Sequence, residues 1–251
     1  ELYRIDDEWW FRDNWDRHQR NADWGYKHSH NPIRYHSEWI RRSRETDYDY
    51  SSLTSMMELI TRNNFSEAEV NRIFDQDLMT LNAAVRGYSG DWDTFTLNRG
   101  KNGYLYRKST DGLFMLLHWD SDLAFQNATE TFIGNLRGVR NYFHKSYNRR
   151  LYRHHLSRIV NEFAKDSPRM DAWFDAEEAS SSSFSVDRNK YENWFRDRES
   201  RANSEIGSDR NVTFAVTTGN GQAASTSEPV YTIRGNAPSS VYTVKVEGHP
   251  E

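Results

Sequence analysis

The sequence predicts an α+β protein, in which a mostly helical domain with one small β-hairpin precedes a partial β-sandwich. Three observations support this prediction: apolar residues recur at helical spacing over several stretches, two short strands flank an Asp-Gly turn, and the composition shifts to Thr, Val, Ser and Gly after residue 210. The chain has 251 residues, which suits one sizeable domain with a small appendage. We expect the domains to cover residues 1–206 and 211–251.

Helical spacing predicts three long helices. Ser66 and Glu69 have the capping-box spacing, in which the Ser and Glu side chains each bond a free backbone amide at the start of a helix. The apolar residues at helical spacing behind them are Val70, Ile73, Phe74, Leu78, Leu81 and Val85. This helix is expected to end near Gly87. Two more helices are expected at Val139–Phe163 and Val186–Ile206, with Ser180–Ser183 as a loop before the last one.

Short strands are predicted on both sides of the first helix. The chain opens with a strand at Leu2–Ile5, and a hairpin follows at Gly103–Arg107 and Leu113–Trp119. Asp111-Gly112 is its turn signal, because Gly accepts the positive φ that such turns need. Residues 6–48 are dense in Trp, Arg, Asp and His without a sustained period, which predicts an irregular segment with short helices, pinned by its aromatic side chains.

The tail, residues 211–251, is predicted to be a β-rich module. Short alternating runs at 212–216, 230–233 and 241–246 predict strands, and Gly219-Asn220-Gly221 predicts a turn between them. We expect this tail to form part of a sandwich.

Aromatic residues compensate for a low apolar content. Hydrophobic residues make up 36% of the chain and include 9 Trp, 14 Tyr and 13 Phe. Each buried aromatic side chain removes roughly 150–250 Å² from water, so a core can form from few residues. We therefore expect most of the chain to be ordered.

Charge, apolar runs and cysteine content exclude several classes of protein. The chain carries 33 Lys and Arg against 37 Asp and Glu, a net charge of −4, whereas a general nucleic-acid binder usually has a basic excess. The longest apolar run, Leu113–Leu117, is far shorter than the roughly 20 residues that span a bilayer. With no cysteine, the sequence excludes disulfides, thiolate metal sites and cysteine nucleophiles. We expect no nucleic-acid partner and no membrane span in this chain.

Acidic residues gather in two loops beside the predicted hairpin. Asp91 and Asp93 precede its first strand, Asn102 lies directly before that strand, and Asp120 and Asp122 follow its second strand. Asp120 and Asp122 are two residues apart on a stretch expected to be extended, so they would point the same way. Carboxylate and amide oxygens are the ligands that Mg²⁺ prefers. The two interpretations left open are a magnesium site and a set of acids that simply cap turns.

These residues also resemble a known family. Asp93, the run Lys101-Asn102-Gly103-Tyr104-Leu105-Tyr106, a short hairpin and His118-Trp119-Asp120-Ser121-Asp122 are similar to the core signature of the CotH family of atypical kinases, known from spore coat proteins. The opening strand and the Arg-rich helix at Phe195–Arg201 agree with the family's flanks. The resemblance covers roughly residues 1–206, and the tail resembles the Ig-like segments that often follow such domains.

The resemblance implies a role for each matching residue. Asp93 would be the catalytic Asp that orients or deprotonates the acceptor hydroxyl. Asn102 and Asp120 would hold Mg²⁺ or Mn²⁺, and Asp122 would be a further metal or supporting ligand. Asn98, at the ordinary kinase spacing from Asp93, competes with Asn102 for its role. His118 stands where the family usually has Pro.

The function implied is that of a kinase. It would transfer the γ-phosphoryl group of ATP, the co-substrate, to Ser or Thr of a surface or extracellular protein, and the chain would be secreted or lie at the cell surface, in association with cell-surface or polysaccharide material. The kinase-like large lobe would lie in residues 1–206. The resemblance implies a small lobe with the phosphate-binding Lys upstream of Glu1, and Lys27 is poorly placed to replace that Lys. Without the small lobe, the chain alone would be inert.

Three alternatives remain at this stage. The chain could be a catalytically inactive CotH-like surface scaffold or carbohydrate-binding module. It could use the same nucleotide site for another protein modification, such as adenylylation, because a fold does not fix a function. A metal-dependent hydrolase using Asp93, Asp120 and Asp122 is the third.

Overall fold

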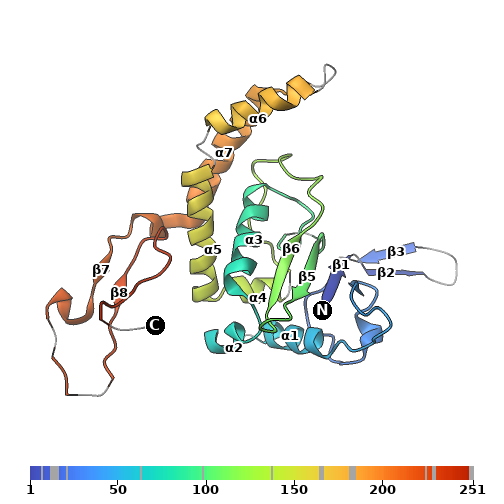
Figure 1. Cartoon of the computed structure of the whole chain (residues 1–251), viewed down its shortest axis with the longest axis horizontal. Coiled ribbons are helices and arrows are strands. Elements are labelled where there is room, and N and C mark those ends of the chain that lie inside the picture. Colours follow the sequence, from blue (N-terminus) through green and yellow to red (C-terminus); the bar gives the residue numbers. More distant parts are fainter. Residues whose placement is uncertain are drawn as a thin grey trace.

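A four-stranded antiparallel sheet forms the centre of the fold, and a helical pair and an extended tail project from it (Figure 1). The strand order is β4-β1-β5-β6, with β1 at Leu2–Ile5, β4 at Trp39–Arg41, β5 at Gly103–Arg107 and β6 at Phe114–His118. The computed structural model describes all residues except 7, 12–16, 21, 63, 98, 137, 164–166, 181–184, 224, 228–229 and 249–251.

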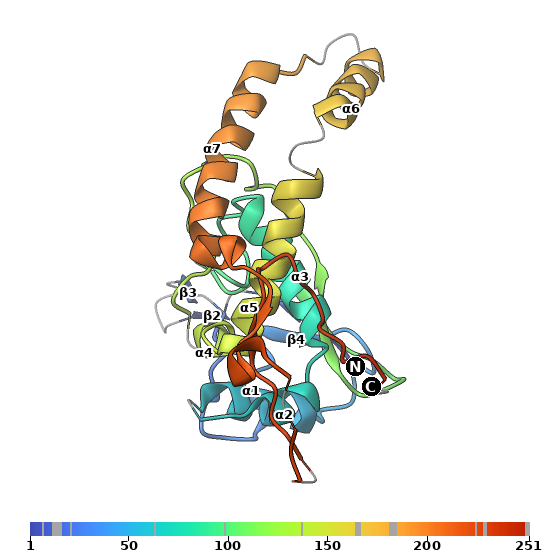
Figure 2. The same cartoon turned by 90° about the vertical axis from the view of Figure 1, so that its left-hand side faces the viewer.

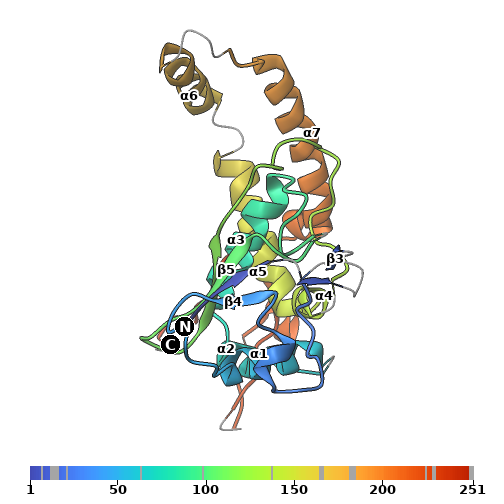
Figure 3. The same cartoon turned by 90° about the vertical axis from the view of Figure 1, so that its right-hand side faces the viewer.

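The helices pack on this sheet and on one another. They are α1 (Ser51–Thr61), α2 (Glu67–Asn71), α3 (Gln76–Tyr88), α4 (Val139–Phe143), α5 (Ser146–Arg158), α6 (Ser167–Ser180) and α7 (Arg188–Ile206). Helix α3 contacts strand β6 and also α5, which in turn contacts α7. Helix α6 and the first part of α7 extend beyond the rest of the molecule, at the top of Figures 2 and 3. The mixed helix and sheet fold agrees with the predicted α+β class.

Short elements complete the described chain. They are β2 (Glu8–Phe11), β3 (Arg17–Arg20), the 3₁₀-helix η1 (Pro32–Arg34), the π-helical turn η2 (Ile159–Phe163), the 3₁₀-helix η3 (Gly207–Asn211), β7 (Ala215–Val216), the 3₁₀-helix η4 (Thr218–Gly221) and β8 (Gly235–Asn236). Strands β2 and β3 pair with each other, as do β7 and β8.

The predicted hairpin is confirmed. Strand β5 has the expected bounds, and β6 is one residue shorter at each end than expected. The two strands are antiparallel, with Gly103 opposite His118 and Arg107 opposite Phe114. Strand β1 has the predicted bounds and pairs with β5 on the side away from β6.

The predicted helix from Ser66 to Gly87 is two helices. The capping box is present, because Ser66 Oγ accepts from the Glu69 amide at 3.3 Å and Glu69 Oε2 accepts from the Ser66 amide at 2.8 Å. Helix α2 nevertheless ends at Asn71, since Phe74 forms an isolated bridge with Phe114 of the sheet. Asp75 then caps α3. Periodicity missed this break because the bridge joins residues far apart in the sequence.

The other long helices were predicted with mixed success. The stretch Val139–Phe163 divides into α4, α5 and η2. The last helix is confirmed but begins at Arg188, after the side chain of Asp187 caps it by accepting from the Lys190 amide at 3.0 Å. Helices α1 and α6 were not predicted. Ser180 is the last residue of α6 rather than part of a loop, and 181–183 lie outside the described residues.

Residues 6–48 contain strands as well as the expected short helix. Strands β2, β3 and β4 were not predicted there. The prediction of aromatic pinning is confirmed: Trp24 and Trp39 are buried, with ring centroids 4.9 Å apart in a T-shaped contact.

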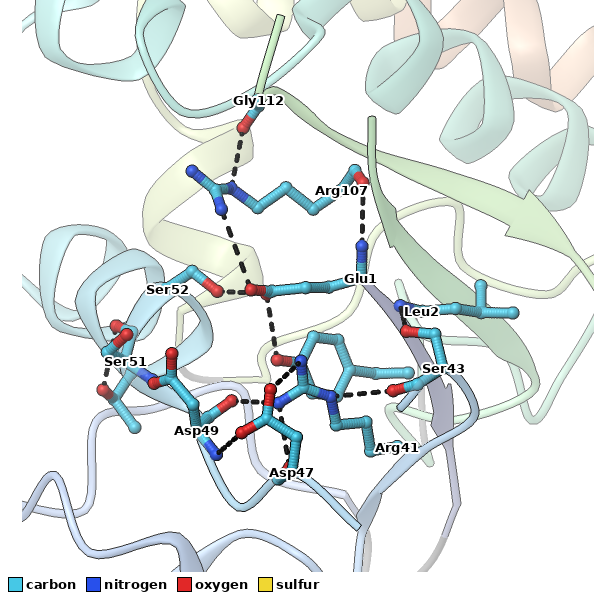
Figure 4. A network of polar contacts seen from close by, with 12 residues as sticks. Glu1, Leu2, Arg41, Ser43, Asp47, Asp49, Ser51, Ser52, Arg107 and Gly112 are labelled. Carbon is cyan, nitrogen blue, oxygen red and sulfur yellow. Dashed lines mark hydrogen bonds and ion pairs between the residues drawn. The ribbon is translucent and has the colours of Figure 1, made fainter. Parts of the chain in front are cut away.

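A buried arginine holds the strap formed by residues 42–50, which connects β4 to α1 (Figure 4). Arg41 donates to the carbonyl oxygens of Ser43 at 2.9 Å and Asp47 at 3.0 Å, and also to that of Asp49. Its guanidinium lies 3.6 Å from the Asp47 carboxylate. The strap is therefore fastened by backbone carbonyls that converge on one side chain.

The structure does not show the predicted sandwich in the tail. In the described part of residues 211–248, the strand pairing is that of β7 with β8, each two residues long. The expected strands at 230–233 and 241–246 are not formed, and Val230, Ile233 and Val244 are more than half exposed. Alternating apolar residues predict a strand only where a second layer covers them. The Ig-like assignment stays a prediction.

The tail instead runs along α5, on the side away from the sheet (Figure 1). Arg150 donates to the carbonyl of Tyr242 at 3.1 Å, and Arg153 forms an ion pair with Asp209. These two arginines of α5 therefore fasten the tail and η3.

Two buried histidines of α5 also face the tail. His154 Nδ1 lies 3.1 Å from the carbonyl oxygen of Ser239, and His155 Nε2 lies 3.0 Å from Asp77 Oδ1. The ring of Tyr242 lies 5.1 Å from that of His154. Burial is the main cause that lowers the pKa of both histidines below the ordinary value, although Asp77 opposes it.

Docking of the tail on α5 is expected to weaken in acid. Because the folded pKa values are lowered, the docked state favours neutral imidazole, and the stabilisation is complete above about pH 6.5 and is lost as the pH falls below it. Hydrogen exchange of residues 237–246, corrected for the intrinsic rate, should be faster at pH 5.5 than at pH 7.5. His154→Asn, which removes one titrating ring, should reduce this response. Protection that is independent of pH in the wild type would contradict the prediction.

Candidate active site

The first loop of the candidate site connects α3 to β5. After α3 ends at Tyr88, the loop passes through Asp91 and Asp93, both buried. A bridge between Thr94 and Lys101 closes it, and the Gly100 amide donates to the Thr94 carbonyl at 3.2 Å. The loop is thus a folded unit whose two ends lie together.

Segments on both sides brace this loop. The Ala22 amide donates to the Arg99 carbonyl at 3.0 Å, and Trp24 Nε1 donates to the Gly100 carbonyl at 2.9 Å. On the other side, the Gly134 amide donates to the Thr96 carbonyl at 2.7 Å. The backbones approach so closely there that a Cβ at position 134 would lie 2.4 Å from the Leu97 carbonyl oxygen.

An ion pair secures the first of these segments. Lys27 pairs with Glu38, whose side chain is fully buried, and Glu38 Oε2 also accepts from the Asp23 amide at 2.9 Å. Lys27 is therefore engaged in bracing residues 22–39, which agrees with its expected unsuitability as a phosphate-binding Lys.

The second loop follows β6 and reaches the same end of the hairpin. Because Gly103 lies opposite His118, Asn102 before β5 and Asp120 after β6 both sit at this end. Both residues have left-handed backbones, with φ of 60° and 55°. Asn and Asp adopt this region more readily than most residues, and such sparsely populated conformations cluster at functional sites.

Arg86 of α3 joins the two loops. It is 1% exposed and forms an ion pair with Asp91. Its guanidinium also donates to the carbonyl oxygens of Trp119 at 2.7 Å and Asp120 at 2.9 Å. One buried side chain therefore sets the position of the second loop relative to the first.

Three carboxylates act on this guanidinium. Burial lowers the pKa of Arg86, and Asp91, Asp93 and Asp120 all oppose that effect. Burial also raises the pKa of Asp91 to about 6; the attraction of Arg86 opposes this, whereas Asp93 and Asp120 add to it. The acids of both loops thus lie in one electrostatic cluster.

His118 and Ser121 extend the cluster but do not form a nucleophile and base. His118 Nδ1 lies 3.2 Å from the Arg86 guanidinium, which only donates, so Nδ1 accepts and a neutral ring carries its proton on Nε2. That Nε2 lies 2.8 Å from Ser121 Oγ and donates to it, and the Ser121 hydroxyl faces Asp91 Oδ2 at 3.4 Å. Burial and Arg86 both lower the pKa of His118, which favours the neutral ring.

One carboxylate oxygen of Asp93 lies near a lysine, and the other has no hydrogen-bond partner in the described part of the chain. Its Oδ2 lies 3.7 Å from Lys101 Nζ, and its Oδ1 is buried with no hydrogen-bond partner in the described part of the chain. The same holds for Asp91 Oδ1 and for the hydroxyls of Thr94 and Thr96. Buried polar atoms without partners are rare in proteins, so their concentration in one loop marks a site that can receive a ligand.

The structure brings part of the predicted site together. Asp93 and Asp120 share the electrostatic cluster around Arg86, and Asn102 lies at the same end of the hairpin. The expected extended stretch from Asp120 to Asp122 is wrong, because Asp120 is left-handed and a turn begins at Asp122, which is exposed. Asn98 lies outside the described residues.

The donor set for a metal ion is sparse. Over the described ranges, no three His, Asp or Glu side chains are grouped so that they hold a metal ion. Mg²⁺ in nucleotide sites usually takes one or two carboxylates and completes its shell with phosphates and water. Asn102 and Asp120 fit that smaller requirement, since their oxygens are hard ligands at one end of the hairpin.

Sequence reasoning missed Arg86 and gave Asp91 no role. Arg86 lies in a helix whose pattern suggested an ordinary last turn, where a basic residue is common. The signal available in the sequence was Asp91 itself, an acid two residues before Asp93 and four before the aromatic Phe95. A second acid so close to a catalytic candidate needs a cation nearby.

The order of these features along the chain, a helix, an acidic loop, a hairpin and a second acidic loop, agrees with a kinase-like fold. The family model described as CotH kinase protein matches residues 1–165, and the chain belongs to the CotH kinase family. No curated protein matches the chain. No helix in the described ranges is long and apolar enough to span a membrane.

Asp91→Ala is expected to lower the free energy of unfolding by about 3 kcal/mol, because it leaves the buried Arg86 without its carboxylate. Urea unfolding at pH 7 measures this loss. Asp122→Ala, at an exposed turn, is the matched control and should change stability by less than about 0.5 kcal/mol. Equal losses in the two variants would contradict the assignment of Arg86 as the link between the loops.

Gly134→Ala tests the close approach beside the first loop. Its Cβ would meet a backbone oxygen, so the substitution should cost about 1–3 kcal/mol of stability. Gly103→Ala is the control, because a Cβ there has its nearest neighbours at 3.6 Å, an ordinary contact. If urea unfolding shows that Gly134→Ala lowers the free energy of unfolding no more than Gly103→Ala does, the prediction is wrong, because the loop then accommodates the added Cβ without losing stability.

Proposed function

We propose that this chain is a metal-dependent protein kinase domain that transfers the γ-phosphoryl group of ATP to Ser or Thr of a surface or extracellular protein. One observation carries the proposal: Arg86 holds the two acidic loops together, with Asp93 and Asp120 both acting on its charge. Membership of the CotH kinase family supports the use of a nucleotide and a protein acceptor.

Asp93 is the residue proposed to receive the acceptor proton. In the transfer, the acceptor oxygen bonds to the γ-phosphorus, the bond from that phosphorus to the β–γ bridging oxygen breaks, and ADP leaves. The proton of the acceptor hydroxyl passes to Asp93, whose Oδ1 is buried without a partner in the described chain. Phosphoryl transfer depends mainly on such positioning and on neutralisation of charge.

Asn102 and Asp120 are the residues proposed to hold Mg²⁺ or Mn²⁺, with Asp122 as a further ligand. The ion would supply neutralisation of charge on the β- and γ-phosphates. The left-handed backbones of Asn102 and Asp120 support this role, because each fixes the direction in which its side chain leaves the loop.

An inactive surface scaffold is the second candidate. The observation that favours it is the buried ion pair of Arg86 with Asp91, which stabilises the two loops whether or not a nucleotide binds. A scaffold would keep the fold and the arginine link between the loops without needing a nucleotide. The family's association with spore coats supports a secreted or cell-surface location for either candidate.

Nucleotide binding and transfer separate the two candidates. In a longer chain that includes the small lobe expected upstream of Glu1, Mg-ATP should raise the melting temperature, and Asp120→Ala should abolish the rise. Asp93→Asn should keep the rise but lower transfer of label from γ-labelled ATP to Ser/Thr peptides by about 10² or more. Asp197→Asn, an exposed acid on α7, is the matched control and should behave as the wild type.

Three outcomes would contradict the proposal. A wild-type protein that includes the small lobe and shows neither a melting shift nor label transfer would favour the scaffold. Label entering the peptide from the α-phosphate would indicate adenylylation. Release of phosphate without any labelled acceptor would indicate a hydrolase.

A further inference from the structure

Arg198 of α7 is a buried cation with no ion pair in the described part of the chain. Its side chain is fully buried, and burial lowers its pKa to about 10, so it stays charged at neutral pH. It donates from Nε to the Tyr88 carbonyl at 2.9 Å and from Nη1 to the Ala128 carbonyl at 3.0 Å. The carbonyl oxygens of Glu130 and Gly87 accept from it too. Backbone oxygens therefore satisfy most of its donors.

These carbonyls come from the segments that carry the two acidic loops. Gly87 and Tyr88 end α3, directly after Arg86 and three residues before Asp91. Ala128 and Glu130 belong to the stretch that follows the second loop. The last carbonyls of a helix lack intrahelical partners and favour a cation, so the end of α3 is a natural place for this guanidinium.

Aromatic contacts from α7 reinforce the same two segments. The guanidinium lies 3.8 Å from the ring centroid of Phe132. Trp194 packs edge-on against Phe125 with centroids 5.0 Å apart and against Tyr88 at 6.2 Å. Phe125, three residues after Asp122, is left-handed, with φ of 59°, and its amide donates to the Ser89 carbonyl at 2.8 Å.

We propose that Arg198 is a positioning residue for the candidate active site, and that α7, which lies beyond the matched residues 1–165, is part of the catalytic unit. Arg198 fixes the end of α3 from one side, while Arg86 ties that same end to the second loop. Loss of Arg198 would free the end of α3 and the 128–130 stretch together. The positions of Asp91, Asp93 and Asp120 relative to one another would then no longer be fixed, although the three side chains themselves would be unchanged.

The physical cost of the arrangement supports this role. A buried charge is expensive unless it is well hydrogen-bonded, and carbonyls compensate it less well than a carboxylate would. An apolar residue at this position would avoid that cost but would remove a hydrogen bond from each of the four carbonyls. The planar, five-donor guanidinium can bond carbonyls from two segments at once, which the compact ammonium of Lys cannot reproduce.

Hydrogen exchange on the full chain tests the positioning without relying on activity. Arg198→Gln should speed exchange of residues 87–93 and 119–130 by about tenfold, under conditions where the protein is folded, because several hydrogen bonds are lost there. Arg41→Gln is the matched control, since Arg41 is also buried and bonded to backbone carbonyls, but at residues 42–50. It should speed exchange at 42–50 and leave the two loop segments within about twofold of the wild type.

Arg198→Lys provides a second variant should Arg198→Gln fail to fold. It keeps the charge and some donors, so the same two segments should show a smaller increase in exchange. Faster exchange throughout the chain, or none at 87–93 and 119–130 in the variant that folds, would overturn the proposal.

Kinetics add an arm that rests on the proposed function. Arg198→Lys should lower kcat for peptide phosphorylation by about tenfold or more, with the KM for Mg-ATP changed less, because orientation is lost rather than a ligand contact. A change in KM alone would overturn the positioning role. If a wild-type chain that includes the small lobe has no transferase activity, the proposed function fails, and the exchange experiment still decides the role of Arg198.

Discussion

The contact on which the candidate site depends is that of the buried Arg86 guanidinium with Asp91 and with the carbonyls of Trp119 and Asp120. A guanidinium that is almost fully removed from water must have its donors and its charge satisfied nearby. Both loops therefore lie against α3, because their carboxylate and carbonyl oxygens satisfy this guanidinium. The acids in them become neighbours as a consequence of satisfying one cation.

The end of α3 is accordingly the fixed point of the site. Arg86 acts from within the helix, and Arg198 reaches its last carbonyls from α7. Trp194 of α7 packs against Phe125 after the second loop, and the backbones approach closely at Gly134 beside the first loop. The left-handed conformations of Asn102 and Asp120 are retained at the ends of a well-paired hairpin, where register holds them in place.

Local signals in the sequence located the parts of the site but not what joins them. The Asp111-Gly112 turn and the strand pattern predicted the hairpin almost to the residue, and the acids on either side of it led to Asp93 and Asp120. The link through Arg86 was not predictable, because a basic residue near a helix end has the same pattern whether it is exposed or buried. The break before Asp75 and the left-handed turn at Asp120 likewise depend on contacts between distant segments. The strands expected in the tail lack a second layer to cover them.

The position of α7 bears on where this protein can be shortened. A chain cut at residue 165, where the family match stops, would expose the buried rings of Tyr88 and Phe132 to water and remove a hydrogen bond from each of four backbone carbonyls. Such a fragment would expose an aromatic patch beside the end of α3, which would have lost hydrogen bonds. It would therefore aggregate more readily than the intact chain. The folding unit therefore extends beyond residue 165 and includes α7.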